Sequence, residues 1–307
     1  MTKRVVTSSP QASLIDVQRL LAEEGLTRIV IVDSSGNPEG IVSEKDVMRF
    51  VLTDRTMRGF EEVHAQEVMS CGLSTIKPDA RMAQAAEAMI RQKRSSLLVR
   101  NGGPEGILTK TDVVKYLDAE GGGTHSVGHF MTVHPVTVSP TQSIFSIVDL
   151  MSHHEISRVI VVDDNDKPQG IITLADFSQR RAYSLFNLSK RLIATKDQTP
   201  AAFLEHAAAI GLMAKHFMTQ HPITVSHDSD LTSAARLMTK HDISGLPVMD
   251  DSRNLVGIVS KTDITRAAAY ERNKRAHTLS RNPWSKLKPM LSRSSRDDAK
   301  QKSANDA

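Results

Sequence analysis

The chain has 307 residues, which is enough for two domains of ordinary size. Its 39 Lys and Arg against 35 Asp and Glu leave a net charge of +4, too small an excess to indicate a nucleic-acid-binding protein. The single cysteine, Cys71, excludes a disulfide framework and a multi-cysteine zinc site. No apolar run reaches the ~20 residues that cross a bilayer, and no secretory signal follows Met1, so we expect a cytoplasmic protein without a membrane span.

One heptad occurs four times along the chain. It consists of a glycine, two aliphatic residues, a hydroxyl residue, two variable positions and an aspartate, and its copies span residues 40–46, 106–112, 170–176 and 257–263. Before each copy comes a stretch with helical periodicity and then an aliphatic run of strand length. Four copies in one register predict four related folding units.

The units follow one another in chain order. We expect repeat 1 at residues 1–60, repeat 2 at 64–119, repeat 3 at 124–182, an inserted helical linker at 183–210, repeat 4 at 211–270 and a basic, disordered tail at 271–307. The glycine run 121–123 predicts a flexible joint after repeat 2. The linker either mediates contacts between domains or copies, or merely lengthens the last helix of repeat 3. Repeats 2 to 4 open on Met followed by Ser or Thr, an opening that repeat 1 is expected to lack.

Repeat 4 shows the internal plan most clearly. Residues 223–225 predict a strand, and Leu231, Ala234, Ala235 and Met238 form the apolar stripe of a helix. Two further strands are expected at 245–249 and 255–259, and Ser260 opens a helix that runs through Ala269. The fold class is therefore α/β, with four β-α-β-β-α units. Each unit is small for an independent core, so we expect them to pair, 1 with 2 and 3 with 4.

The heptad has two readings. Ser or Thr three residues before Asp is a capping box, which needs no ligand. The same helix start offers free amides to a phosphate, and its carboxylate can accept both hydroxyls of a ribose. The second reading predicts a nucleotide, whose base would lie against the strands.

These repeats resemble CBS (cystathionine β-synthase) domains, which occur in tandem pairs and bind adenosyl ligands in the cleft between the pair. The resemblance implies α+β domain pairs with pseudo-twofold symmetry, as two Bateman modules. It implies that ribose is bound by the aspartates Asp46, Asp112, Asp176 and Asp263. It also implies that phosphate is contacted by the hydroxyl residues Ser43, Thr109, Thr173 and Ser260.

The residue before each second-strand apolar run separates odd from even repeats. It is Arg28, Ser96, Arg158 and Gly245 in chain order. Arginine there resembles the phosphate-facing arginines of the gamma subunit of AMP-activated kinase, which also carries four repeats. We therefore add Arg28 and Arg158 to the candidate phosphate ligands, together with the heptad lysines Lys45, Lys110 and Lys261; the alternatives are a solvated strand-edge arginine and ordinary surface lysines.

The candidate base pocket consists of strand residues Ile76, Val138, Ile223, Val225 and Pro247. CBS domains often carry aliphatic-Pro-aliphatic in the second strand, and repeat 4 keeps it as 246–248. Val30, Leu98 and Ile160 replace that proline elsewhere, which predicts a reshaped base pocket in three units. The scattered histidines lack metal-ligand spacing, so no metal site or cofactor is predicted. The apolar methionines are expected to serve core packing.

No Walker loop, Gly-x-Ser-x-Gly elbow or His-Glu-x-x-His motif occurs, so no catalytic residue is predicted. The sequence favours a non-catalytic regulatory protein that binds AMP, ADP or ATP as an energy sensor and acts on a separate protein target. The modules should associate into a flat disc, within one chain or as a homodimer. Two alternatives remain open: a sensor of S-adenosylmethionine, and a nucleic-acid-binding protein acting through the tail.

Overall fold

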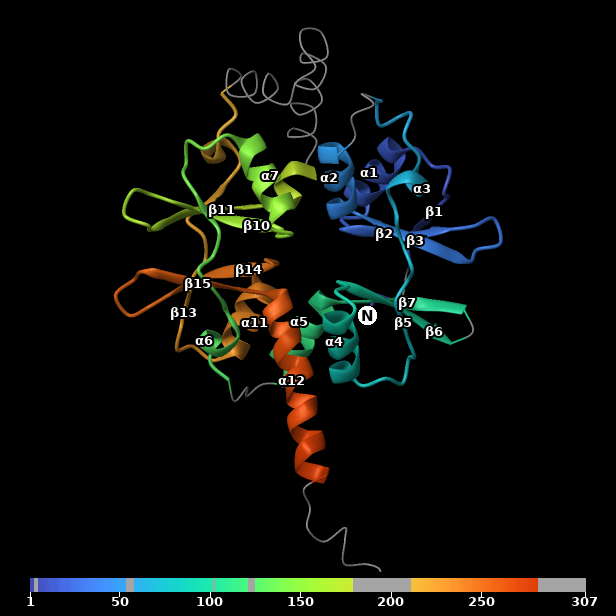
Figure 1. The fold of residues 1–307 in the computed structure, drawn as a ribbon. Coiled ribbons are helices and arrows are strands. Elements are labelled where there is room, and N and C mark those ends of the chain that lie inside the picture. Colours follow the sequence, from blue (N-terminus) through green and yellow to red (C-terminus); the bar gives the residue numbers. More distant parts are fainter. Residues whose placement is uncertain (3–4, 54–57, 102, 121–124, 179–210, 281–307) are drawn as a thin grey trace, which may run out of the picture.

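The fold is seen in a computed structural model, which describes residues 1–2, 5–53, 58–101, 103–120, 125–178 and 211–280 (Figure 1). The inserted linker predicted at 183–210 lies outside these residues, as do the glycine joint and the tail beyond Ser280. Along the described part of the chain, no helix combines the length and apolarity needed to cross a bilayer.

The four repeats share one order of elements. Repeat 1 contains β1 (Thr7–Ser8), α1 (Leu14–Glu23), β2 (Arg28–Val32), β3 (Pro38–Ser43) and α2 (Glu44–Thr53). Repeat 2 contains α3 (Ala65–Val68), β4 (Ser70–Cys71), β5 (Thr75–Ile76), α4 (Met82–Arg91), β6 (Ser96–Asn101), β7 (Gly103–Thr109) and α5 (Lys110–Glu120).

The second half repeats this plan. Repeat 3 contains α6 (Val127–Phe130), β8 (Thr132–Val133), β9 (Thr137–Val138), α7 (Ile144–His153), β10 (Arg158–Val162), β11 (Pro168–Thr173) and α8 (Ala175–Ser178). Repeat 4 contains the 3-10 helix η1 (Ala214–His216), β12 (Thr219–Gln220), β13 (Val225–Ser226), α11 (Leu231–Lys240), β14 (Gly245–Met249), β15 (Leu255–Ser260) and α12 (Lys261–Ser280).

Local sequence explains how each unit is built. Helix α1 begins where the hydroxyl of Ser13 accepts the amide of Asp16, and α11 begins where the carboxylate of Asp230 accepts the amide of Thr232. In each repeat the second and third strands form an antiparallel hairpin, and a short parallel strand flanks it. The buried face of α11 is the stripe Leu231, Ala234, Ala235 and Met238, as predicted.

Paired repeats complete each other's sheets. The short strand that opens repeat 2, β4, joins the sheet of repeat 1 in the order β1-β2-β3-β4. Repeats 3 and 4 exchange β8 and β12 in the same way. These short strands were not predicted from the sequence, although the Met-Ser/Thr opening of repeats 2 to 4 marks them.

The expectation that repeat 1 lacks this opening is wrong. Thr2 pairs with Ile107 of β7 as an isolated antiparallel bridge, with N–O distances of 3.0 and 3.1 Å. Ile41, Ile171 and Ile258 pair in the same manner with the opening strands β4, β12 and β8. Met1-Thr2 therefore serves as the missing opening, and repeats 1 and 2 exchange strands reciprocally.

The exchange of opening strands explains why the first residue of the heptad is glycine. A Cβ built at Gly40 would lie 2.6 Å from Sδ of Met69, the methionine that precedes β4. The same clash would arise at Gly170 with Met218 and at Gly257 with Met131. Only glycine leaves room for the incoming methionine.

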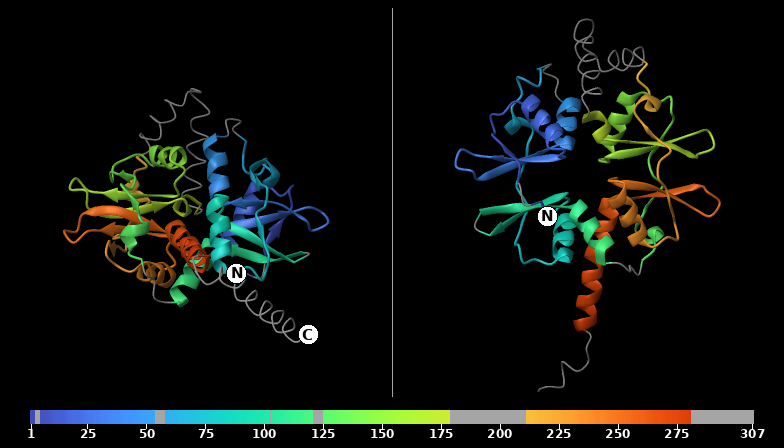
Figure 2. Two further views of the ribbon diagram at one scale, coloured as in Figure 1. Left: turned by 60° about the horizontal axis from the view of Figure 1, so that its bottom comes forward. Right: turned by 180° about the vertical axis from the view of Figure 1, so that it is seen from behind.

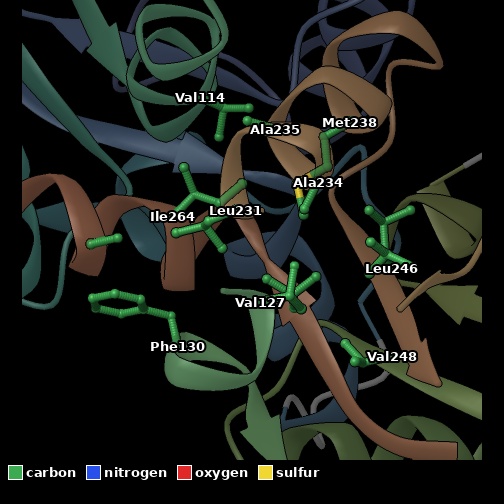
Figure 3. Close-up of a cluster of buried hydrophobic side chains, with 13 residues drawn as sticks. Val114, Val127, Phe130, Leu231, Ala234, Ala235, Met238, Leu246, Val248 and Ile264 are labelled. Carbon is green, nitrogen blue, oxygen red and sulfur yellow. The ribbon is translucent and has the colours of Figure 1, made fainter. Parts of the chain in front are cut away.

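The two modules, repeats 1 and 2 and repeats 3 and 4, pack side by side within one chain. Figure 1 shows repeat 1 beside repeat 3 and repeat 2 beside repeat 4, and Figure 2 shows the same arrangement from behind. Helices α4 and α5 of repeat 2 contact α12 and α11 of repeat 4. Val114 of α5 belongs to the core cluster of repeat 4, where it lies near Ala235 and Ile264 (Figure 3).

Helix α12 is longer than predicted. It continues through Ser280, whereas the sequence pattern placed its end near Ala269 and a disordered tail from residue 271. The apolar stripe ends where the helix leaves the neighbouring repeats, so periodicity gave no signal for the last turns. In Figures 1 and 2 this part of α12 projects beyond the modules.

Candidate functional site

The last helix of each repeat carries an aspartate in its first turn, and the four aspartates share one local geometry. Oδ2 of Asp46, Asp112, Asp176 and Asp263 accepts the backbone N–H of the heptad Ser or Thr at 2.9, 2.8, 2.6 and 2.7 Å. It also accepts that residue's hydroxyl, at 2.5 Å from Ser43, 2.8 Å from Thr109, 2.8 Å from Thr173 and 2.6 Å from Ser260. The capping contact is thus present in all four repeats, and it uses one oxygen of each carboxylate.

The second carboxylate oxygen distinguishes the sites. Oδ1 of Asp46 accepts Arg49 at 2.9 Å and the Ser70 hydroxyl at 2.7 Å. Oδ1 of Asp263 pairs with Arg266 at 2.5 Å. Asp46 and Asp263 are both buried, with exposures of 6% and 1%.

Asp112 has a different second partner. The amino group of Met1 lies 3.0 Å from its Oδ1. Burial opposes ionisation of Asp112, but the hydrogen bonds from Thr109 and the ammonium group hold its pKa below the ordinary value. The start of the chain therefore covers the ribose-binding candidate of repeat 2.

The two predicted arginines cross to the partner repeat. Arg28 donates to the Ser95 hydroxyl at 2.8 Å, and Arg158 donates to the Ser244 hydroxyl at 3.0 Å. A Cβ built at Gly245 would lie 2.5 Å from Nη1 of Arg158. The residue before the second-strand apolar run is thus small in repeat 4, where it is Gly245, because Arg158 of repeat 3 occupies the space beside it.

These arginines lie in surroundings that disfavour their charge. Burial lowers the pKa of Arg158 to about 10, with Asp263 opposing the shift, and burial lowers that of Arg28 as well. Among the described residues, the buried Nε of Arg158 has no hydrogen-bond partner. A buried N–H left in this way favours an anionic acceptor.

Two lysines cross between the modules. Lys110 of repeat 2 donates to the Thr262 hydroxyl of repeat 4 at 2.9 Å, and Lys261 donates in return to Thr111 at 3.0 Å. Burial, followed by repulsion from Arg28, lowers the pKa of Lys110 to about 8, while Asp263 opposes the shift. The pKa of Lys261 is lowered by burial too. Positive charge from both modules therefore gathers at their contact.

A cavity of about 240 Å³ lies beside Asp263. It takes residues from both members of the second module: Thr132, His134, Pro135, Val136, Glu155, Ile156, Ser157 and Arg158 of repeat 3, and Ile258, Ser260, Thr262 and Asp263 of repeat 4. Of the predicted site residues, the structure brings Arg158, Ser260 and Asp263 together here, and Lys110 reaches its wall through Thr262. Lys45 is exposed.

None of the five candidate base-pocket residues, all of which the structure describes, lines the cavity beside Asp263. Val138, Val225 and Pro247 are buried, and Ile76 and Ile223 pack against core clusters. Sequence reasoning missed Val136 and Ile156, which supply apolar wall. Repeat alignment could have found Val136, since it is the equivalent of Ile223.

Known proteins contain repeats that match these four. A family model described as "CBS domain" matches residues 1–53, 65–119, 127–182 and 214–270. The chain belongs to the CBS domain family. Repeats 1 to 4 are thus CBS repeats, and the exchange of opening strands is how they pair.

CBS relatives match over one or both modules. The uncharacterized protein MJ1404 of Methanocaldococcus jannaschii is 26% identical over 88% of this chain, and this chain spans 61% of its length. The crystal structure of MJ1225 from the same organism, described as a proposed archaeal homologue of g-AMPK, has a TM-score of 0.70 at 19% identity, covering 87% of this chain and 96% of MJ1225. That likeness shows a shared four-repeat fold.

One relative has been crystallised with a nucleotide. CBSX2 of Arabidopsis thaliana is 29% identical over 48% of this chain, and this chain matches 64% of its length. The structure of CBSX2 in complex with AMP is 26% identical, covers 48% of this chain and 98% of that chain, and has a TM-score of 0.37.

Proposed function

We propose that this protein is a regulatory sensor that binds adenine nucleotides between paired CBS repeats, with the cleft beside Asp263 as its first site. Ribose hydroxyls would donate to Asp263, phosphate would accept from Arg158 and the start of α12, and the base would lie against Val136 and Ile156. The same roles are proposed for Asp112, Asp176, Thr109, Thr173, Arg28 and Lys261 in the remaining clefts. Asp46, Ser43 and Lys45 would take them in the fourth cleft only once Arg94 no longer fills it.

One observation carries this proposal: a single cavity joins a carboxylate that is 1% exposed to a half-buried arginine whose buried Nε lacks a partner among the described residues. A ribose next to an anion meets both requirements. Water alone would leave the charge of Arg158 unneutralised in a poorly solvated place.

The charge of the site favours a nucleotide over S-adenosylmethionine. Arg158 and Lys110 are both cations, and neither ion-pairs with a carboxylate at the distances found among the described residues. A sulfonium beside them would be repelled, whereas each phosphate would gain charge-assisted hydrogen bonds. AMP, the nucleotide held by CBSX2, is the first ligand to test.

The output of the sensor is proposed to be conformational and non-catalytic. Thr262 lines the cavity and also accepts Lys110 of the other module, so a phosphate arriving there changes a contact between modules. Ligand binding can shift the relative populations of module arrangements only through such differential contacts. A separate protein target would read the change.

The proposal is tested by calorimetric titration with AMP, ADP, ATP and S-adenosylmethionine. We expect an adenine nucleotide to bind more tightly than S-adenosylmethionine, and Asp263→Asn to weaken its affinity at least about tenfold, the loss of roughly 1.5 kcal/mol from one charged hydrogen bond. Asp164→Asn, in an exposed hairpin, is the charge-matched control and should bind as the wild type does. Equal affinity in Asp263→Asn and wild type would return the heptad to helix capping alone.

A further inference from the structure

The clefts differ at one position, the third residue after the end of the first long helix of each repeat. In repeats 1, 3 and 4 this residue is aliphatic: Leu26, Ile156 and Ile243. In repeat 2 it is Arg94. The equivalence is fixed by the preceding residue, which has positive φ in every repeat, at Gly25, Lys93, Glu155 and Asp242. Ile156 supplies apolar wall to the cavity beside Asp263, so Arg94 stands at the corresponding wall of the cleft beside Asp46.

Arg94 is held in place by two hydrogen bonds to backbone carbonyl groups of its own repeat. Its Nη2 donates to the carbonyl oxygens of Cys71 and Gly72, both at 3.3 Å. These two residues directly follow Ser70, whose hydroxyl donates to Asp46 Oδ1 at 2.7 Å. The wall, the backbone acceptors and the carboxylate of this cleft are therefore all engaged by the chain's own groups.

A second substitution accompanies the arginine. Gly72, with φ of 74°, stands where the other described clefts carry His134 and His221, also at positive φ. A Cβ built at Gly72 would lie 3.7 Å from Nη2 of Arg94. This is an ordinary van der Waals distance, so position 72 lies directly beside the guanidinium.

We propose that Arg94 closes the cleft beside Asp46 to adenosyl ligands, so that the clefts are occupied selectively. The inference rests on the proposed function, since it takes the cleft beside Asp263 as the open form of the same site. A purine entering the Asp46 cleft would have to displace the guanidinium from the carbonyl oxygens of Cys71 and Gly72, and both hydrogen bonds would be lost. An aliphatic residue at the same position imposes no such cost.

The test exchanges the two residues. Arg94→Ile should add one AMP site, and Asp46→Asn in that background should remove it. Ile156→Arg should abolish binding beside Asp263. The double variant Arg94→Ile/Ile156→Arg should bind AMP through Asp46 instead. Arg94→Leu serves as a second opening variant, and circular dichroism melts confirm that each variant is folded.

Cys71 gives a second readout, because its carbonyl oxygen is one of the two that accept Arg94. It is the single cysteine of the chain and it is exposed. We expect saturating AMP to slow its alkylation by iodoacetamide several-fold in Arg94→Ile and not at all in the wild type. Protection of Cys71 by AMP in the wild type, or unchanged stoichiometry and alkylation in both folded opening variants, would overturn the inference.

The two proposals fail separately. If the wild type binds AMP beside Asp263 but neither opening variant gains a site, the closure is wrong and the proposed function stands. If the wild type binds no nucleotide, the proposed function fails, and a gained site in Arg94→Ile that depends on Asp46 would still support the closure by Arg94.

Discussion

Arg158, the proposed phosphate ligand, has surroundings that oppose stability. It is held by the hydroxyls of Ser157 and Ser244, at 3.3 and 3.0 Å, and among the described residues no carboxylate lies within ion-pair distance of it. A half-buried cation without a counter-ion is poorly solvated and lowers the stability of the fold, and a long apolar side chain at the same place would not. We attribute its presence to ligand binding.

The first prediction at this scale is that Arg158→Met raises the melting temperature while it weakens AMP binding. The loss should be about tenfold or more for AMP and close to zero for adenosine, because adenosine lacks the phosphate. Calorimetry and thermal melts measure both effects. A variant that loses AMP and adenosine equally would show that Arg158 shapes the cleft rather than binding phosphate.

The second concerns Lys110, whose pKa is lowered by burial to about 8 from the ordinary value of 10.5. Above pH 8 the folded protein releases this proton before the unfolded chain does, so the unfolded chain binds more protons there and the free energy of unfolding should rise toward pH 10. Lys110→Gln should flatten that rise, while Lys261 retains part of it. Exposed Lys45→Gln is the control. Denaturant unfolding across this range would contradict the account if Lys110→Gln kept the full slope.

At the residue scale, the sequence indicated which residues are candidates for the site but not which residues they contact. Arg28, Arg158 and the four aspartates could be chosen as candidates from their repeat-equivalent positions, because side-chain chemistry can be read directly from the sequence. That Arg158 rests on Gly245, or that Lys110 serves the other module, depends on contacts between distant segments, which no local pattern encodes.

At the scale of elements, the hairpins and helices were predictable and the exchanged strands were not. Strands β4, β8 and β12 are two residues long, too short for an alternation of apolar and polar residues to be recognised. Their signal was the recurring Met-Ser/Thr pair together with the heptad glycine, two features whose connection is visible only in space.

This connection predicts that Gly40→Ala destabilises the protein by about 1–3 kcal/mol, since the new methyl group meets Sδ of Met69 at 2.6 Å. Met69→Ala removes that sulfur, so the double variant should be more stable than the sum of the two single effects predicts. Chemical denaturation of all four members of the cycle measures the coupling. Additive effects would mean that the glycine has another role.

At the scale of the whole molecule, α4 and α5 of repeat 2 pack against α11 and α12 of repeat 4, so that these two repeats share buried residues. Ala268 and Ala269 of α12, 7% and 8% exposed, belong to the same cluster as Ala85, Ala86 and Met89 of α4. The sequence left open whether the disc forms within one chain or between two. These contacts form it within one chain, and small residues let the helices approach closely.

Ala268→Glu should therefore separate the modules, because it places an unpaired charge in the shared cluster. We expect a larger radius of gyration by small-angle X-ray scattering and a lower melting temperature. Ala119→Glu, on the exposed end of α5, is the control and should leave both unchanged. An unaltered scattering profile for Ala268→Glu would show that the modules are held by other contacts.

The most direct measurement is a crystal structure grown with saturating AMP. The account predicts nucleotide in the cavity between repeats 3 and 4, with ribose hydroxyls on Oδ1 of Asp263 and phosphate on the guanidinium of Arg158. Solvent alone in that cavity, with Asp263 still bonded only to Ser260 and Arg266, would contradict it.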